Sequence, residues 1–250
     1  MSDLPDDNAL AATIATSAGG LLLELRAALS DADLDTVKAE GDRSSHEFIM
    51  QELRRARPDD AVLSEEAADD PARLTAARVW IVDPLDGTRE YGEGRSDWAV
   101  HVALVIDCVV VASAVALPGL GVTLTADPPS VLEPPHDGGP RLVVSRTRPP
   151  AIAERVATAL GGELVPLGSA GAKAMAVVRG EADVYLHSGG QYEWDSAAPV
   201  GVAAAAGLHT SRIDGSPLRY NQENPWLPDL LICRPELAEA VLALVNAGEP

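Results

Sequence analysis

A short acidic turn in the first third of the chain limits what the sequence can fold into and what it can do. The apolar run at 79–82 is typical of a buried strand, and it ends on Asp83. Pro84 has no N–H to give to a sheet, so we expect the strand to stop there. Asp86 and Gly87 then predict a tight turn. Two carboxylates three residues apart at a strand end can point at one place.

The chemistry of this turn favours a functional site over an ordinary loop. Thr88 adds a hydroxyl next to the two carboxylates, and the N–H groups of the turn are free to hold an anion. Carboxylate oxygens suit hard divalent cations, and such ions also take phosphate oxygens as partners. An ordinary surface loop would contain two acids, a proline, a glycine and a threonine in one turn only by coincidence. The turn therefore predicts a site for cations and a phosphate.

Three further acidic positions stand out, although each has an ordinary explanation when it is taken alone. Asp42 precedes a helix predicted over 43–56, Glu65 follows a short strand, and Asp195 begins a helix of small residues. Asp42 and Asp195 could simply be helix N-caps, and Glu65 could be a solvated turn residue. No single one of these three positions therefore indicates a site, and their assignment to the same site as Asp83 depends on the presence of all three in one sequence.

The chain divides at a proline-rich segment, residues 127–140, which holds five prolines and two glycines and is predicted to be a long loop or linker. Helices precede strands before it, which is typical of an α+β fold, whereas strands and helices alternate after it, which is typical of an α/β fold. We therefore predict an overall α/β class with domains at 1–140 and 141–250. The predicted helices lie at 8–29, 43–56, 150–160, 169–179 and 194–206. The predicted strands lie at 61–63, 79–82, 98–106, 109–117, 142–145, 163–166 and 183–187.

The charge and composition exclude several classes of partner. Nineteen basic and 38 acidic residues give a net charge of −19, which argues against binding to nucleic acid or to an anionic membrane. We find no apolar stretch as long as a membrane span, and residues 1–9 lack the basic start of a secretory signal. Cys108 and Cys233 lie in apolar surroundings and are predicted to be reduced thiols. A cytoplasmic protein is expected.

Several motifs resemble one family. The turn from Asp83 to Thr88 is similar to the signature of the inositol-monophosphatase superfamily, whose members are lithium-sensitive, magnesium-dependent phosphatases. Trp194-Asp195, followed by small residues, resembles its second motif, and Glu65-Glu66 resembles its acidic pair at a strand end. The resemblance covers about residues 8–232. It implies a layered αβαβα sugar-phosphatase fold, a cofactor of two or three Mg²⁺ ions, and a homodimer as a common assembly.

The resemblance also implies roles for single residues. Thr88, hydrogen-bonded to Asp42, would orient and deprotonate a water on the first metal, and backbone N–H groups of Gly87 and Thr88 would hold the phosphate. Glu65 would join Asp42 and Thr88 in catalysis. The first metal would be bound by Glu65, Asp83 and the Leu85 carbonyl, and the second by Asp83, Asp86 and Asp195.

Three local patterns resemble one branch of the superfamily, the 3'(2'),5'-bisphosphate nucleotidases of the CysQ type. Arg89-Glu90-Tyr91 is similar to its Lys-Glu-Phe, and residues 144–148 are similar to its Val-Ser-Arg-Ser-His. Gly168-Ser169 followed by Lys173 resembles its Gly-Ser-Ser-Leu-Lys, with the lysine one position later here. This implies hydrolysis of 3'-phosphoadenosine 5'-phosphate (PAP) to AMP and phosphate in support of sulfate assimilation.

A nucleotide with two phosphates would leave one phosphate to be bound away from the metals. Arginine pairs well with phosphate through its planar fork, and a tyrosine can pack against a base. The substrate-binding residues predicted from the motifs and from this requirement are Gly87, Thr88, Arg89, Ser145, Arg146, Ser169, Lys173, Asp195, Arg219 and Tyr220.

Three alternatives stay open at this point. The same chemistry could act on inositol 1-phosphate or fructose 1,6-bisphosphate. The chain could instead be an aspartyl-phosphate phosphatase. The signature of that class is Asp-x-Asp-Gly-Thr, in which the two aspartates are one residue closer than Asp83 and Asp86 are here. A non-catalytic sensor of a phosphorylated ligand would have no need of the water-activating pair Asp42 and Thr88.

Overall fold

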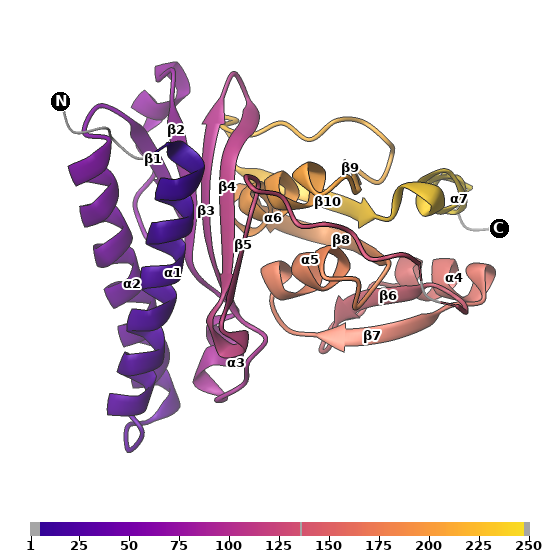
Figure 1. Cartoon of the computed structure of the whole chain (residues 1–250), viewed down its shortest axis with the longest axis horizontal. Helices are drawn as coiled ribbons and strands as arrows, with labels where there is room; N and C mark the ends of the chain where they lie inside the picture. The colour runs from indigo at the N-terminus through magenta and orange to yellow at the C-terminus, as the bar shows by residue number, and fades with distance from the viewer. Residues whose placement is uncertain (1–5, 136, 248–250) are drawn as a thin grey trace.

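Two β-sheets alternate with three layers of helices in the computed structural model, which describes residues 6–135 and 137–247 (Figure 1). The α-helices are α1 (Asp7–Ala28), α2 (Leu34–Ala56), α3 (Thr88–Gly92), α4 (Ala151–Leu160), α5 (Ala170–Val178), α6 (Glu193–Ala205) and α7 (Pro235–Asn246), and short 3₁₀ turns lie at Pro71–Thr75 and Pro118–Leu120.

Each sheet has five strands. Sheet A has the order β1 (Ala61–Ser64), β2 (Val79–Asp86), β3 (Ala99–Ile106), β4 (Val109–Leu117) and β5 (Val122–Thr125). Sheet B has the order β7 (Glu163–Leu167), β6 (Arg141–Ser145), β8 (Val184–Tyr192), β10 (Trp226–Cys233) and β9 (His209–Ser211). The sequence did not predict β5, β9, β10 or α7, and β10 pairs antiparallel with β8, so that sheet B is mixed.

Three apolar cores hold the layers together. The first joins α1 and α2 to one face of sheet A, and the second fills the space between the two sheets with α5 and α6. The third joins the other face of sheet B to α4 and α7. This arrangement confirms the predicted α/β class and the layered αβαβα fold.

Helix α2 begins earlier than the sequence predicted. Asp33 is its N-cap and accepts a hydrogen bond from the Thr36 N–H at 2.9 Å. Asp42 therefore lies inside the helix, and the expectation that it could be an N-cap is wrong. Gly41 does not break the helix but allows close packing, because a Cβ there would lie 2.8 Å from Cε1 of Tyr91.

Strand β2 does not stop at Pro84 but continues to Asp86. Its parallel neighbour β1 pairs only as far as Val82, so Pro84 lies where no partner requires its missing N–H. The pairing with β3 shifts between Asp83 and Asp86, which is a bulge. The Ser45 hydroxyl donates to the Pro84 carbonyl at 2.7 Å, so α2 fixes the bulge from the other side.

Strand β8 is also longer than the predicted strand at 183–187. It continues through Gly189 and Gly190, which have φ angles of 113° and 91°, and its register against β10 shifts at this point. Such backbone angles favour glycine. The irregular end of β8 leads directly into α6 and Asp195.

The predicted boundary near residue 140 separates the strands of the two sheets. Helix α6 nevertheless comes from the second half and packs against β2, β3 and β4 of the first. The division into domains at 1–140 and 141–250 stays a prediction.

Helix α1 is long and apolar enough, by length and composition, to cross a membrane, contrary to the expectation that no apolar stretch reaches that length. Its residues Leu10, Ile14 and Leu22 are buried in the core that α1 and α2 share with sheet A. This packing is that of a core helix.

Candidate metal and phosphate site

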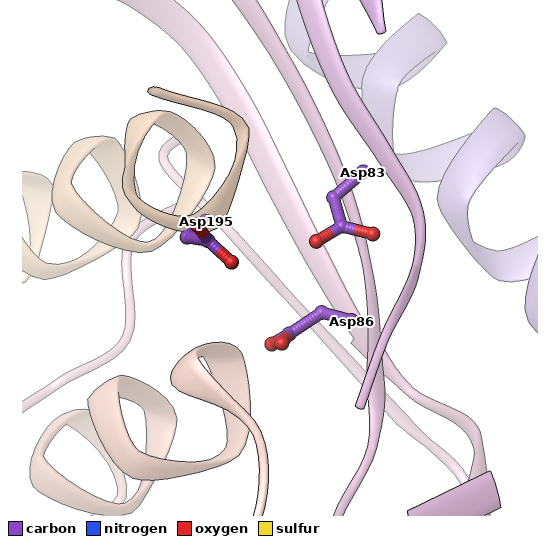
Figure 2. A group of neighbouring side chains, drawn as sticks. All are labelled: Asp83, Asp86 and Asp195. Carbon is purple, nitrogen blue, oxygen red and sulfur yellow. The ribbon is translucent and has the colours of Figure 1, made fainter. Parts of the chain in front are cut away.

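Three aspartates from two distant segments meet between the sheets. Asp83 and Asp86 come from the end of β2, and Asp195 comes from the first turn of α6 (Figure 2). One carboxylate oxygen from each lies within 4.8 Å of the others. Asp195 also accepts a hydrogen bond from the Tyr192 N–H at 2.6 Å, so it caps α6 as well as facing the other two aspartates.

Burial and mutual repulsion mark this group as one that needs positive charge. Burial, followed by the negative charge of Glu65, raises the pKa of Asp83 well above its usual range. Burial and Asp86 raise the pKa of Asp195 to about 6, and burial and Asp195 raise that of Glu65 to about 7. A buried set of oxygen donors that repel one another fits a hard divalent cation.

Asp86 is stabilised in its charged form, unlike its neighbours. It accepts hydrogen bonds from the Ala170 and Gly171 N–H groups, at 3.2 and 2.5 Å, at the start of α5. Nε2 of His101 lies 3.2 Å from its carboxylate as an ion pair. Burial would raise the pKa of Asp86, but His101 and these N–H groups outweigh burial and lower it.

His101 was missed by sequence reasoning. Its ring is fully buried on β3, and Nδ1 lies 2.9 Å from the Trp194 carbonyl on α6. Burial lowers the pKa of His101, yet Asp86 raises it above its ordinary value. The ring therefore connects Asp86 to the helix that carries Asp195. A lone histidine in an otherwise apolar strand was the available signal.

The predicted pair Thr88 and Asp42 is also assembled. Oγ1 of Thr88 lies 3.1 Å from both the Asp42 carboxylate and the Leu85 carbonyl. Burial, followed by the charge of Glu66, raises the pKa of Asp42 to about 6. The hydroxyl therefore stands beside a carboxylate that can accept a proton near neutral pH.

A cavity of about 600 Å³ opens beside Asp86 and Asp195. It brings together seven of the predicted substrate-binding residues, Gly87, Arg89, Ser145, Arg146, Ser169, Lys173 and Asp195. Thr88 is not in its lining.

The cavity contrasts in charge with the whole chain. Four cations and three carboxylates line it, while the chain carries a net charge of −19. Arg148 is one of the four cations and was not assigned a role from sequence, although it lies only two residues after Arg146. A local excess of positive charge is what an anionic substrate requires.

Lys173 and Ser169 both organise the start of α5. The Lys173 ammonium is buried and donates to the Gly168 and Ser169 carbonyls, each at 2.6 Å. Burial lowers the pKa of this lysine. The Ser169 hydroxyl accepts from the Ala172 N–H at 3.0 Å and caps the helix.

Arg219 and Tyr220 do not line this cavity. Arg219 is exposed, and Tyr220 is buried in a separate apolar cavity of about 440 Å³ formed largely by β4 and α6. Its hydroxyl accepts a hydrogen bond from Ser196 at 3.3 Å. Because Tyr220 is fixed in the core, its predicted contact with adenine has no support in this geometry.

Comparison with known proteins identifies a family of phosphatases. The sequence model described as the inositol monophosphatase family matches residues 7–128 and 140–248. A 3'-phosphoadenosine 5'-phosphate phosphatase of Mycobacterium leprae is 51% identical over 96% of this chain and 93% of that protein. A 3'(2'),5'-bisphosphate nucleotidase CysQ of Escherichia coli K12 is 33% identical over 80% of this chain and 85% of that protein.

Solved structures agree with the sequence comparison. The crystal structure of CysQ from Bacteroides thetaiotaomicron, described as a bacterial member of the inositol monophosphatase family, superposes with a TM-score of 0.77. It is 26% identical and covers 91% of this chain and 97% of that one. The chain belongs to the inositol monophosphatase family.

Proposed function

We propose that this protein is a metal-dependent phosphatase that hydrolyses PAP to AMP and phosphate. The observation that carries the proposal is a cavity whose lining combines two aspartates of the buried acidic cluster, Asp86 and Asp195, with the cations Arg89, Arg146, Arg148 and Lys173. A mononucleotide with two phosphates fits such a cavity, because one phosphate reacts among the carboxylates and the other is bound by the cations. The 51% identity to a PAP phosphatase over nearly the whole chain supports the same substrate.

The cofactor in this proposal is Mg²⁺, bound as two or three ions by Asp83, Asp86, Asp195, Glu65 and the Leu85 carbonyl. These divalent cations supply Lewis-acid charge to the phosphate and lower the pKa of water. The donor set is made only of oxygen, and the raised pKa values of Asp83 and Asp195 indicate carboxylates that lack neutralising charge.

The residues of the chain supply the proton transfer and the orientation of the substrate. Thr88 holds the attacking water through its hydroxyl and passes a proton to Asp42, whose pKa of about 6 suits that task. The N–H groups at the Gly87 turn hold the reacting phosphate, and Gly87 adopts a left-handed φ of 86° that presents them. No covalent intermediate is needed.

The second phosphate of PAP is assigned to the cationic end, formed by Arg146, Arg148 and Lys173. A role in sulfate assimilation follows from the substrate. A cytoplasmic homodimer that requires neither nucleic acid nor a membrane belongs to the same proposal, on the strength of the net charge and the family.

Phosphate release with Mg²⁺ tests the proposal. PAP, inositol 1-phosphate and fructose 1,6-bisphosphate are compared by kcat/KM, and we expect PAP to be the preferred substrate by at least about tenfold. Preference for either of the other two would move the protein to the sibling activity. Binding of PAP without release of phosphate would make it a sensor and leave the contact between Thr88 and Asp42 unexplained.

A further inference from the structure

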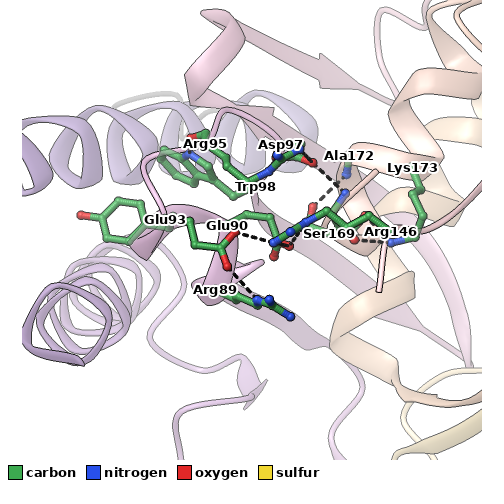
Figure 3. Close-up of polar contacts among 12 residues, drawn as sticks. Arg89, Glu90, Glu93, Arg95, Asp97, Trp98, Arg146, Ser169, Ala172 and Lys173 are labelled. Atoms are coloured by element: carbon green, nitrogen blue, oxygen red, sulfur yellow. Dashed lines mark hydrogen bonds and ion pairs between the residues drawn. The ribbon is translucent and has the colours of Figure 1, made fainter. Parts of the chain in front are cut away.

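A buried glutamate connects α3 to the cationic end of the cavity. Glu90 follows Arg89 on α3, and its side chain is buried. One of its oxygens, Oε1, accepts hydrogen bonds from Nε and Nη2 of Arg146 at 3.0 and 2.8 Å (Figure 3). The guanidinium of Arg146 therefore donates two hydrogen bonds to one carboxylate oxygen.

A neighbouring glycine provides the space for this side chain. A Cβ on Gly168 would lie 2.3 Å from Cγ of Glu90, and a Cβ on Gly87 would lie 3.4 Å from its Oε2. Glu90 thus passes close to the phosphate-binding turn before it reaches Arg146. A side chain at Gly168 would crowd the glutamate, whereas the approach at Gly87 is an ordinary van der Waals contact, so it is Gly168 that leaves the room this path needs.

A second glutamate extends the arrangement. Oε2 of Glu93 lies 2.5 Å from Nη2 of Arg146, and Oε1 of the same residue lies 2.8 Å from Nε of Arg89 (Figure 3). Two glutamates therefore fix two arginines at the cavity wall. In the described part of the chain, Nη1 of Arg146 has no hydrogen bond to a protein group, so a donor remains for a ligand.

We infer that Glu90 is a positioning residue that holds Arg146 in place to bind the second phosphate of the substrate, and that Glu90 thereby determines preference for bisphosphates. This rests on the proposed function. A fixed guanidinium gives up less side-chain entropy when it binds phosphate, and its fork geometry gives directional hydrogen bonds. The opposite possibility is that Glu90 competes with the phosphate for Arg146. The two possibilities predict opposite changes in the preference for bisphosphates when the charge of Glu90 is removed: a decrease if Glu90 positions Arg146, and an increase if it competes with the phosphate.

Adenosine 3'-monophosphate is the matched substrate, because it keeps the base and the reacting phosphate but lacks the 5'-phosphate. The measured quantity is the ratio of kcat/KM for PAP to kcat/KM for the monophosphate, with Mg²⁺ present. In the unmodified protein we expect a ratio of at least about 100. Glu90→Gln should lower this ratio about tenfold, mainly through a higher KM for PAP.

A double-variant cycle shows whether Glu90 acts through Arg146. Arg146→Ala should lower the ratio further than Glu90→Gln, and the double variant should be no worse than Arg146→Ala alone. Arg146→Lys, which keeps the charge but loses the fork, should fall between them. Glu47→Gln is the control, because Glu47 pairs with Arg43 at 3.0 Å on the exposed surface of α2, and its ratio should match that of the unmodified protein.

The outcomes separate the inference from the proposed function. A ratio near one in the unmodified protein would overturn the inference and the assignment of the second phosphate to Arg146, whereas the absence of PAP hydrolysis would overturn the proposed function itself. A high ratio that Glu90→Gln leaves unchanged, or raises, would overturn the inference alone. Additive losses in the double variant would also overturn it, because Glu90 would then act by another route. Thermal unfolding of each variant verifies that the fold is retained.

Discussion

The two ends of the cavity are built on opposite electrostatic patterns. At the acidic end, Asp83 and Asp195 crowd together with raised pKa values, and the ion pair with His101 is made by Asp86. At the cationic end, Arg146 is already paired with two glutamates. The acidic end is incomplete without added cations, whereas the cationic end is assembled in advance. We therefore expect substitutions at the acidic end to abolish the reaction and those at the cationic end to change substrate preference.

Asp83→Asn should have the largest effect. Its carboxylate is only 1% exposed and is proposed to face both metal positions, so removal of its charge should lower kcat by about 10³-fold or more. The loss should be equal for PAP and for adenosine 3'-monophosphate, because it concerns only the reacting phosphate. Steady-state kinetics at saturating Mg²⁺ measure it. A loss below tenfold would remove Asp83 from the centre of the site, and a loss confined to PAP would break the contrast between the two ends.

Thr88→Val should follow, with a loss of about 10²- to 10³-fold in kcat. The substitution keeps the shape of the side chain and removes the hydroxyl that contacts Asp42 at 3.1 Å. KM for PAP should change little, since Thr88 is outside the lining of the cavity. Thr88→Ser, which keeps the hydroxyl and removes only the methyl group, is the control and should retain most of the rate. Equal losses in both variants would show that packing, rather than the hydroxyl, matters here.

The difference between the two ends also explains what could be predicted from sequence. The acidic turn at Asp83 is local, because the carboxylates, the glycine and the threonine lie within six residues and their chemistry is specific. The joining of Asp195 to them depends on α6 packing across sheet A, which no local pattern contains. It was predicted only through resemblance to a family.

The two misjudged elements are explained by tertiary contacts. The helix was predicted to begin only after Asp42 and the strand to stop at Pro84, yet Gly41 permits contact with Tyr91 inside α2 and Pro84 lies where β1 has ended. Propensity rules describe an average environment, and tertiary contacts decided both cases. The partners of Arg146 were equally hidden, because Glu90 lies 56 residues away on another layer.

His101→Gln should weaken the acidic end without removing a metal ligand. The histidine contacts Asp86 at 3.2 Å and the Trp194 carbonyl at 2.9 Å, so its loss should reduce Mg²⁺ affinity by about ten- to a hundredfold. Mg²⁺ dependence of activity and calorimetric titration of the metal both measure it. The ratio of PAP to adenosine 3'-monophosphate should stay constant at saturating Mg²⁺. A changed ratio with normal affinity would place His101 in substrate recognition instead.

The smallest expected effect is on stability, and it concerns the acidic end alone. The folded pKa values of Asp195 and Glu65, about 6 and about 7, lie above the ordinary values of 3.8 and 4.5. Between about pH 4 and pH 7 the folded, metal-free protein therefore binds more protons than the unfolded chain, and its stability falls as pH rises through that window.

Divalent cations should reverse this loss, because they and protons compete for the same carboxylates. Saturating Mg²⁺ should raise Tm by about 5 °C or more at pH 8, and by less at pH 5. Thermal unfolding with Mg²⁺ and with a chelator, at both pH values, measures the difference. Asp195→Asn should reduce the rise in Tm that Mg²⁺ causes at pH 8. Glu90→Gln should leave this rise unchanged, because Glu90 is already paired with Arg146 at the cationic end. An equal Mg²⁺ effect at both pH values would show that the crowding of carboxylates is not what the metal relieves.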